Sequence, residues 1–353
     1  MIRAELYKLF KRKLVWEVFA GVFALMIVSE IYLNSYYLYG GHYRELQDEI
    51  ALHEKYRGEL TDERLYAFLT ERWGSFYEKY PEETYDYMDS FCDEEGNELR
   101  VGVGAVSVDS VFPETGFPVQ FGYYQGWALF LDQLPRYLKY LSIFVAVAFA
   151  SLFSYERDCG MQEILFCTKR GREDCIRAKV AGAFLVTNIS YLVMVLLPCI
   201  TAFILYQGKG LGTSIQMTPW IRDSQLDMSY GKLLLHTIFL SLVTINVILL
   251  LSLTAAFVVK NPTKAVCITL AVLFLLRPDI VSGYLQSAVM DRITAMTPVN
   301  VMDTLNLAKQ TPLDINGVKL QWLTMAEIFY SVALVWGGAF FFWQLPKKGG
   351  DGE

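Results

Sequence analysis

The charged stretch SYERDCGMQEILFCTKRGR, from Ser154 to Arg172, decides how the rest of this chain is interpreted. It separates two hydrophobic runs, Arg136–Phe153 and Val180–Tyr206. Each run is close to the roughly 20 apolar residues that a helix needs to cross a bilayer, and the first is near the short limit. The sequence therefore predicts two membrane spans joined by a loop, residues 154–179, which lies at a membrane surface and contains a short amphipathic turn.

Hydrophobic runs of this kind recur along the chain, and 54% of its 353 residues are hydrophobic. Soluble domains contain about 45–50% apolar residues. We therefore expect an all-α membrane protein with six transmembrane helices. The predicted spans are Leu14–Leu33, Arg136–Phe153, Val180–Tyr206, Lys232–Val259, Ala265–Leu285 and Met325–Phe342.

The fifth span is irregular. Its first part, Ala265–Leu276, is apolar, and Arg277, Pro278 and Asp279 follow. Twelve helical residues rise only about 18 Å, whereas the hydrocarbon core of a bilayer is about 30 Å thick. The chain must therefore continue past Pro278 or turn back as a re-entrant pair.

Lysine and arginine residues flank the predicted spans on one side. They occur in Met1–Lys13, in residues 154–179, beside the turn at Lys260 and Lys264, and after the last span at Lys347 and Lys348. Loops rich in these residues face the cytosol. We expect both termini in the cytosol and the chain in a cell membrane, of the bacterial plasma type. Met1–Lys13 fits an interfacial helix that contacts membrane lipid, or only a basic flank of span 1.

Residues 36–135, here called the outer domain, are strongly acidic. They contain 20 acidic and 7 basic residues, so their net charge of −13 contrasts with −6 for the whole chain. Thr61, Asp62 and Glu63 predict a helix start, and from Val101 to Phe121 the pattern is typical of loops or short strands. The expected organisation is an interfacial helix and span 1 in residues 1–35, a mostly helical extracellular insertion in 36–135, spans 2–6 in 136–348 with an extracellular segment at 286–324, and a tail at 349–353.

Patterns that would indicate catalysis are absent from the sequence. The glycine-rich stretch Gly208–Gly212 lacks the spacing of a phosphate-binding loop, and the three histidines, His42, His53 and His236, form no metal motif. We expect no catalytic residue, no metal, no cofactor and no nucleic-acid partner. The six cysteines are expected to be free thiols.

Polar residues inside the predicted spans are few, and each is a candidate for function. Asn188 and Asn246 lie deep in spans 3 and 4, where interhelical hydrogen bonding is favoured over contact with a substrate. Arg277, Pro278 and Asp279 are the strongest pathway candidates, because broken helices at membrane depth line cavities or are buried in protein. A structural cap at the outer interface is an equal alternative for these three.

The order and spacing of these features resemble the ABC-2 type permeases, the membrane subunits of ATP-binding-cassette exporters. Residues 153–165 are similar to that family's F-x-x-E-x-x-x-G-x-x-E-x-L stretch, and Thr168–Arg172 and Arg177–Lys179 to its basic turn and its entry to span 3. Met1–Lys13 resembles its interfacial elbow helix. The insertion of about 100 residues between spans 1 and 2 departs from the common form and leaves the substrate open.

The resemblance implies a partner arrangement and a coupling role for the loop. Two permease subunits, identical or different, would pair above two ATPase subunits, which would bind the ATP. The residues that would contact the ATPase are Glu156, Gly160, Met161, Glu163, Ile164, Leu165, Lys169, Arg170 and Arg172.

Export of a peptide, drug or lipid-like substrate is the function that this resemblance implies. A membrane sensor or immunity protein whose acidic outer domain binds a peptide is the alternative, and a membrane-embedded enzyme is a third. Co-purification of an ATPase would distinguish the first from the other two.

Overall fold

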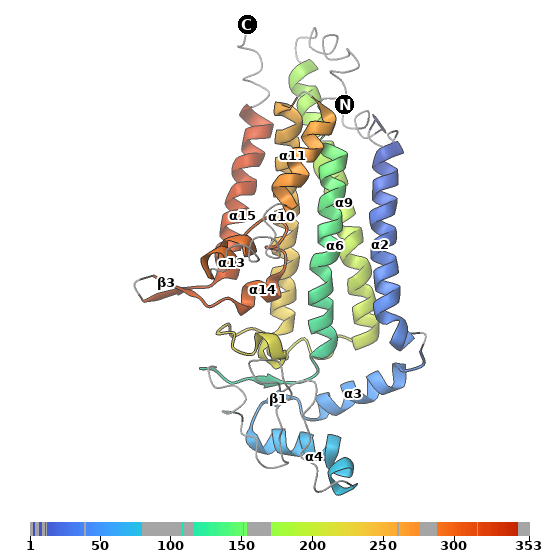
Figure 1. The fold of residues 1–353 in the computed structure, drawn as a ribbon, viewed down its shortest axis with the longest axis vertical. Coiled ribbons are helices and arrows are strands. Elements are labelled where there is room, and N and C mark those ends of the chain that lie inside the picture. Colours follow the sequence, from blue (N-terminus) through green and yellow to red (C-terminus); the bar gives the residue numbers. More distant parts are fainter. Residues whose placement is uncertain are drawn as a thin grey trace.

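The computed structural model describes residues 3, 7–8, 11, 13–38, 40–79, 108, 116–150, 152–153, 171–259, 261–274, 288–315 and 317–344. These residues are mostly helical. Long helices run side by side in one bundle, with the start of α2 and the end of α15 at the same end and α3 and α4 at the other (Figure 1). Two short antiparallel β-pairs lie outside the bundle.

Five long helices form the bundle: α2 (Lys13–Leu38), α6 (Gln125–Phe149), α9 (Gly171–Tyr206), α10 (Tyr230–Val258) and α15 (Trp322–Ala339). Among the described residues, four segments are long and apolar enough to cross a membrane. They are Lys13–Ser35, Glu173–Tyr206, Tyr230–Val258 and Trp322–Phe342. These candidate segments overlap four of the expected spans, and the mostly helical structure is compatible with an all-α membrane protein.

Two helices extend beyond the predicted spans. Helix α6 begins at Gln125 rather than Arg136, because Trp127, Leu131, Leu134 and Leu138 give it a continuous buried face that carries it past Pro135. Helix α9 begins at Gly171 rather than Val180 and continues without interruption to Tyr206. Residues 171–179 of the expected loop at 154–179 are therefore part of a helix.

The fifth predicted span is described only in its first part. Helix α11 (Pro262–Phe274) follows a turn in which the Asn261 side chain accepts a hydrogen bond from the Lys264 N–H at 3.1 Å. Its 13 residues rise only about 20 Å, so α11 alone does not cross a bilayer core of about 30 Å. The expected break at Arg277–Asp279 lies outside the described residues.

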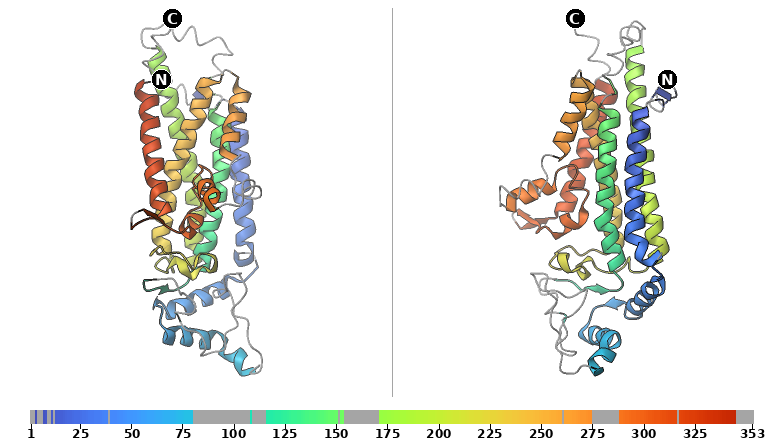
Figure 2. Two further views of the ribbon diagram at one scale, coloured as in Figure 1. Left: turned by 60° about the vertical axis from the view of Figure 1, so that its left-hand side comes forward. Right: turned by 45° about the vertical axis from the view of Figure 1, so that its right-hand side comes forward.

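Two helices, α3 (Tyr43–Lys55) and α4 (Asp62–Lys79), lie at the end of the bundle opposite the start of α2 (Figure 2). The predicted cap is present, because Thr61 Oγ1 accepts a hydrogen bond from the Arg64 N–H at 3.3 Å. Strand β1 (Gly58–Glu59) pairs with β2 (Gln120–Phe121), so a short strand occurs within the region predicted to contain loops or strands. The buried core here includes His53, Phe68 and Phe121.

The connection from α9 to α10 packs on the start of α6. It contains the 3₁₀ turns η1 (Ile215–Met217) and η2 (Pro219–Ile221). Trp127 Nε1 donates to the Lys209 carbonyl at 2.6 Å. Gly210, with φ +83°, lies against the Tyr123 carbonyl so closely that a Cβ atom would be only 1.9 Å from its oxygen.

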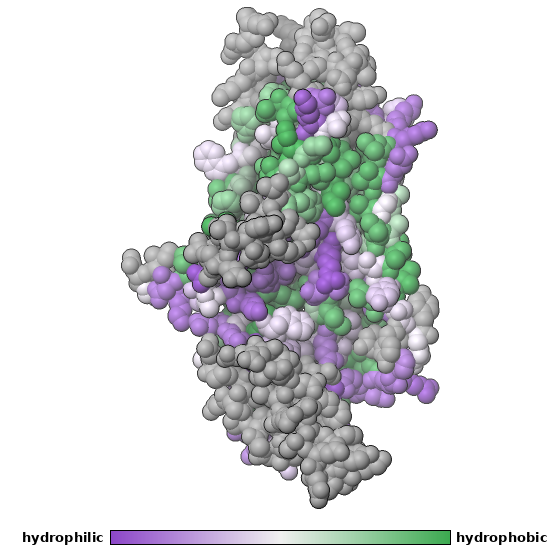
Figure 3. All heavy atoms as spheres, viewed as in Figure 1, coloured by the Kyte–Doolittle hydropathy of each residue, from purple (hydrophilic) through white to green (hydrophobic). Residues whose placement is uncertain are grey.

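The segment before α15 contains two short helices, α13 (Ala288–Ala295) and α14 (Thr304–Lys309), and a hairpin of β3 (Leu313–Ile315) with β4 (Val318–Leu320). The hairpin was not predicted from the sequence. On the face drawn in Figure 3, hydrophobic residues gather over α11 and the neighbouring part of the bundle, and hydrophilic residues gather toward the hairpin.

Candidate functional site

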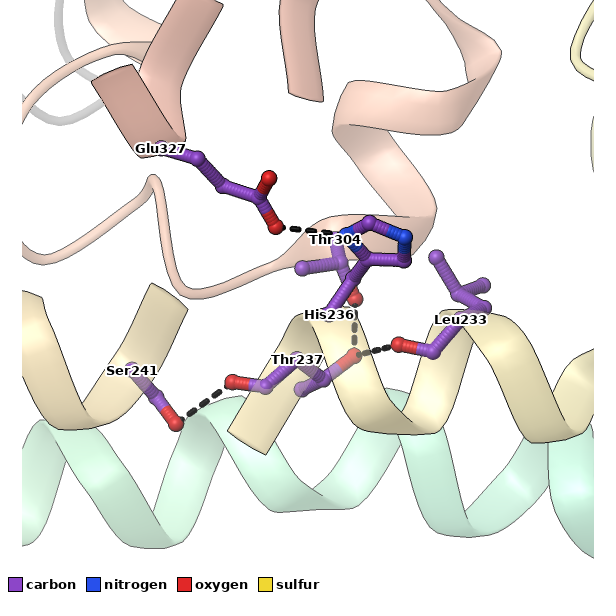
Figure 4. Close-up of polar contacts among 6 residues, drawn as sticks. All are labelled: Leu233, His236, Thr237, Ser241, Thr304 and Glu327. Carbon is purple, nitrogen blue, oxygen red and sulfur yellow. Dashed lines mark hydrogen bonds and ion pairs between the residues drawn. The ribbon is translucent and has the colours of Figure 1, made fainter. Parts of the chain in front are cut away.

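A group of polar side chains inside the bundle joins four helices, and we call it the polar seam. His236 Nδ1 on α10 lies 2.6 Å from a carboxylate oxygen of Glu327 on α15. Their side chains are 38% and 16% exposed, so this pair is half-buried at the contact between the two helices. Figure 4 shows both side chains pointing toward each other. The polar seam consists of Tyr191, His236, Thr237, Ser241, Thr304 and Glu327.

Hydroxyl groups continue the polar seam from α10 to α14. Thr237 donates to the Leu233 carbonyl at 2.7 Å, so the hydroxyl of Thr304, 2.5 Å away, acts as donor to Thr237 (Figure 4). Both threonines are fully buried. Because a buried hydroxyl without a partner costs about 1–3 kcal/mol, this contact fixes where α14 sits against α10.

The polar seam reaches α9 through Tyr191. Its hydroxyl donates to the Ile238 carbonyl at 2.7 Å and lies 2.8 Å from the Ser241 hydroxyl. Ser241 donates in turn to the Thr237 carbonyl at 2.6 Å. The hydrogen bonds therefore link α9, α10, α14 and α15 at one level of the bundle. Polar groups at this depth can hold helices together or line a path for a polar molecule.

Asn188 and Asn246 form a reciprocal amide pair between α9 and α10. Each Nδ2 donates to the Oδ1 of the other, at 3.0 and 3.1 Å. The second N–H of each amide goes to the carbonyl four residues earlier, Phe184 for Asn188 and Leu242 for Asn246. All four amide N–H groups are thus used within the protein. The interhelical hydrogen bond favoured by the sequence is present, and contact of this pair with a substrate stays a prediction.

A second polar group lies where α6, α9 and α15 meet near the start of α9. Lys179 is 4% exposed, and its ammonium lies 5.5 Å from the centre of the Phe153 ring. Arg177 Nε donates to the Phe342 carbonyl at 3.2 Å, and the same guanidinium lies 3.7 Å from Glu173. Arg177 and Lys179 thus connect the first turns of α9 to Phe342 and to Phe153.

Most residues predicted to contact an ATPase lie outside the described residues. Arg172 belongs to the first turn of α9. The others are Glu156, Gly160, Met161, Glu163, Ile164, Leu165, Lys169 and Arg170. The pathway candidates Arg277, Pro278 and Asp279 also lie outside the described part of the chain.

The sequence interpretation missed the pair of His236 and Glu327. In the sequence, His236 is one of three scattered histidines and belongs to no metal motif. One signal was available, because Glu327 is the sole charged residue of α15, and an ionisable residue inside a span is a functional candidate by default. The partner is 91 positions away, however, and no spacing pattern reveals such a pair.

No group of three or more metal-ligating side chains occurs within the described ranges. Comparisons of the chain with protein-family models, with curated proteins and with solved structures found no match.

Proposed function

We propose that this chain is the permease subunit of an ATP-binding-cassette exporter. In this proposal six spans cross a bacterial plasma membrane, and a separate ATPase subunit docks on residues 154–170. A second permease subunit completes the pathway. The motif-like stretch between α6 and α9 is the observation that carries the proposal. The four apolar helices and the absence of a phosphate-binding motif from the sequence are compatible with it.

Helix α9 offers a physical route by which such a loop drives the bundle. Its 36 residues rise about 54 Å, which exceeds a bilayer core of about 30 Å. A helix of this length that begins directly after the loop projects beyond the membrane at the loop end. A force applied to the loop therefore acts on α9 as a lever.

Both ends of α9 are tied to other parts of the chain. At the loop end, Arg177 binds the Phe342 carbonyl in η3 (Phe340–Gln344), the π-helical turn that follows α15, and Lys179 contacts Phe153 after α6. At the far end, Gln47 of α3 donates to the Leu205 carbonyl at 2.9 Å. A displacement of α9 would consequently reach α6, α15 and α3 together. This arrangement suits a protein that converts ATPase closure into opening on the opposite membrane face.

Co-purification tests the proposal. The chain is expressed with the ATP-binding-cassette subunits of its own genome, and we expect one of them to co-purify and hydrolyse ATP. Leu165→Asp should abolish this association, because a charge placed in an apolar contact costs several kcal/mol. Glu163→Arg should abolish it as well, because it reverses the charge of a residue expected at the contact. Leu320→Asp introduces the same charge on the exposed hairpin and is the matched control.

The proposal fails if no ATPase associates with the wild-type chain. It also fails if both loop variants keep full association and full export while thermal unfolding shows them intact. Capture of a peptide by a chain without an associated ATPase would instead support the membrane sensor or immunity protein.

A further inference from the structure

A cavity of about 60 Å³ lies between α2, α6 and α9, away from the polar seam. This volume is enough for one ammonium group and a water molecule, and it is far below the roughly 300–1,000 Å³ of a pocket that encloses a whole drug-sized ligand. Its lining includes Glu30, Leu33, Asn34, Leu129, Gln133 and Tyr206. The cavity can therefore hold a small charged group of a larger molecule.

Glu30 gives the cavity a negative charge. Asn34 Nδ2 donates to a Glu30 carboxylate oxygen at 2.9 Å and also to the Glu30 carbonyl at 3.0 Å. No Lys, Arg or His within the described ranges forms an ion pair with Glu30. Arg136, on the helix that supplies Gln133, is paired with Asp132 at 2.9 Å instead. The carboxylate is held in position, and its charge is not compensated by a described cation.

The rim of the cavity is apolar and exposed. Leu33 is 37% and Leu129 is 47% exposed, and both line the cavity. Next to them on α2, Ile31 and Tyr32 are also exposed. Glu30 stands eight positions before the end of α2 at Leu38, about 12 Å along the helix axis. The opening therefore lies on the apolar surface of the bundle, toward the end of the α2 span that α3 follows.

We propose that this cavity binds the primary ammonium group of an amphiphile. The Glu30 carboxylate is its counter-ion, and Asn34 keeps that carboxylate in place. Gln133 donates its amide N–H to Asp132 at 3.2 Å, so its carbonyl oxygen is available to accept a hydrogen bond from the ammonium. The apolar part of the ligand lies on Leu33 and Leu129. The Glu30 carboxylate and the Gln133 carbonyl are few oxygen ligands for Ca²⁺ or Mg²⁺, which take about six or more. They suit an ammonium group better.

The site does not depend on the proposed export function, because it requires only the folded chain in a membrane. Two kinds of molecule carry the recognised chemistry. One is the head group of an aminophospholipid such as phosphatidylethanolamine, and the other is a single-chain amine or an amphiphilic peptide with a lysine.

Binding of dodecylammonium to the purified full chain tests the site, with dodecanol as the uncharged probe. We expect dodecylammonium to bind at least tenfold more weakly to Glu30→Gln than to the wild type, and dodecanol to bind both equally. Gln at this position still accepts the Asn34 hydrogen bond, so the fold is kept. Glu17→Gln, an exposed acid on the same helix, is the matched control and should behave like the wild type.

A second variant keeps the test decisive if Glu30→Gln folds poorly. Leu129→Lys places an ammonium at the rim of the cavity, and we expect it to block the probe while the protein stays folded. Equal binding of dodecylammonium by wild type, Leu129→Lys and any folded Glu30→Gln would overturn the proposal, as would failure of the wild type to bind.

Native mass spectrometry from nanodiscs then identifies the source of the ammonium. Retention of phosphatidylethanolamine but not phosphatidylcholine, lost in Glu30→Gln or Leu129→Lys, assigns the site to a lipid head group. Binding of dodecylammonium without such retention assigns it to free amphiphiles.

Discussion

His236 Nδ1 on α10 lies 2.6 Å from a carboxylate oxygen of Glu327 on α15, and this contact joins two helices whose other facing residues are mostly apolar. The pair carries one net charge if the imidazole is neutral and none if it is protonated. With a neutral imidazole, the charge of the carboxylate must be stabilised by its hydrogen bonds, since an uncompensated charge at membrane depth costs several kcal/mol. The pair therefore fixes the position of α15 relative to α10 more specifically than packing does.

Removal of both members of this pair should cost less than the sum of the two single removals. We expect His236→Leu and Glu327→Leu each to lower the free energy of unfolding by about 1–3 kcal/mol, because the remaining polar group loses its partner. The double variant should recover about 0.5–2 kcal/mol of the summed loss. Unfolding of the four proteins in detergent measures this coupling, with Phe329→Leu, an exposed residue of α15, as control. Strictly additive losses would show that the contact has no energetic role.

The amide pair of Asn188 and Asn246 should behave as a structural link. Asn188→Leu or Asn246→Leu leaves one amide with an unpaired oxygen and an unpaired N–H, so each should cost about 1 kcal/mol. The double leucine variant should be closer to the wild type in stability. Measurement of stability and of export in vesicles for these three variants distinguishes a structural link from contact with a substrate. If export falls in the double variant while stability is restored, the amides contact the substrate and the structural interpretation is wrong.

The sequence alone revealed the features that depend on local composition. Long apolar runs predicted α2, α9, α10 and α15, because a span requires about 20 such residues. Thr61 predicted the start of α4 through its capping hydroxyl. Features that depend on which helices meet were not visible. His236 and Glu327 stand 91 positions apart, and no periodicity relates them.

Two local patterns in the sequence indicate the hairpin of β3 with β4 and the early start of α6. Asn316-Gly317, between the alternating residues 313–315 and 318–320, is typical of a tight hairpin turn, and Gly317 has φ +83° in the turn between β3 and β4. Helix α6 was cut short at Pro135, although Trp127, Leu131 and Leu134 repeat at helical spacing before it. Pro135 itself lies inside the helix, although proline usually interrupts one.

Gly210 is expected to be the glycine least tolerant of a side chain in the connection between α9 and α10. Its φ is +83°, and a Cβ atom would stand 1.9 Å from the Tyr123 carbonyl oxygen. We expect Gly210→Ala to lower the free energy of unfolding by about 1–3 kcal/mol, since backbone must move. Gly208 has a similar φ of +68° but more space, so Gly208→Ala should lower the free energy of unfolding less than Gly210→Ala does. A Cβ atom at Gly338 would meet nothing within 4 Å, so Gly338→Ala should be tolerated best. A different order of melting temperatures among these three variants would contradict the close packing of this connection on α6.

Arg177 is expected to transmit movement of α9 to α15. Its Nε donates to the Phe342 carbonyl at 3.2 Å, in the turn that continues α15. Arg177→Lys keeps the positive charge but has no group that reproduces the Nε–H, and the lost hydrogen bond should lower stability by only about 1 kcal/mol. If the proposed export function holds, we expect export per hydrolysed ATP to fall about three- to tenfold while association with the ATPase is unchanged. Arg136→Lys, at an exposed pair with Asp132, is the matched control and should leave both quantities unaltered.

Full export by Arg177→Lys would show that the contact only holds the ends of the two helices together. Loss of ATPase association would instead place Arg177 at the docking surface, because a contact between α9 and α15 alone has no reason to affect docking.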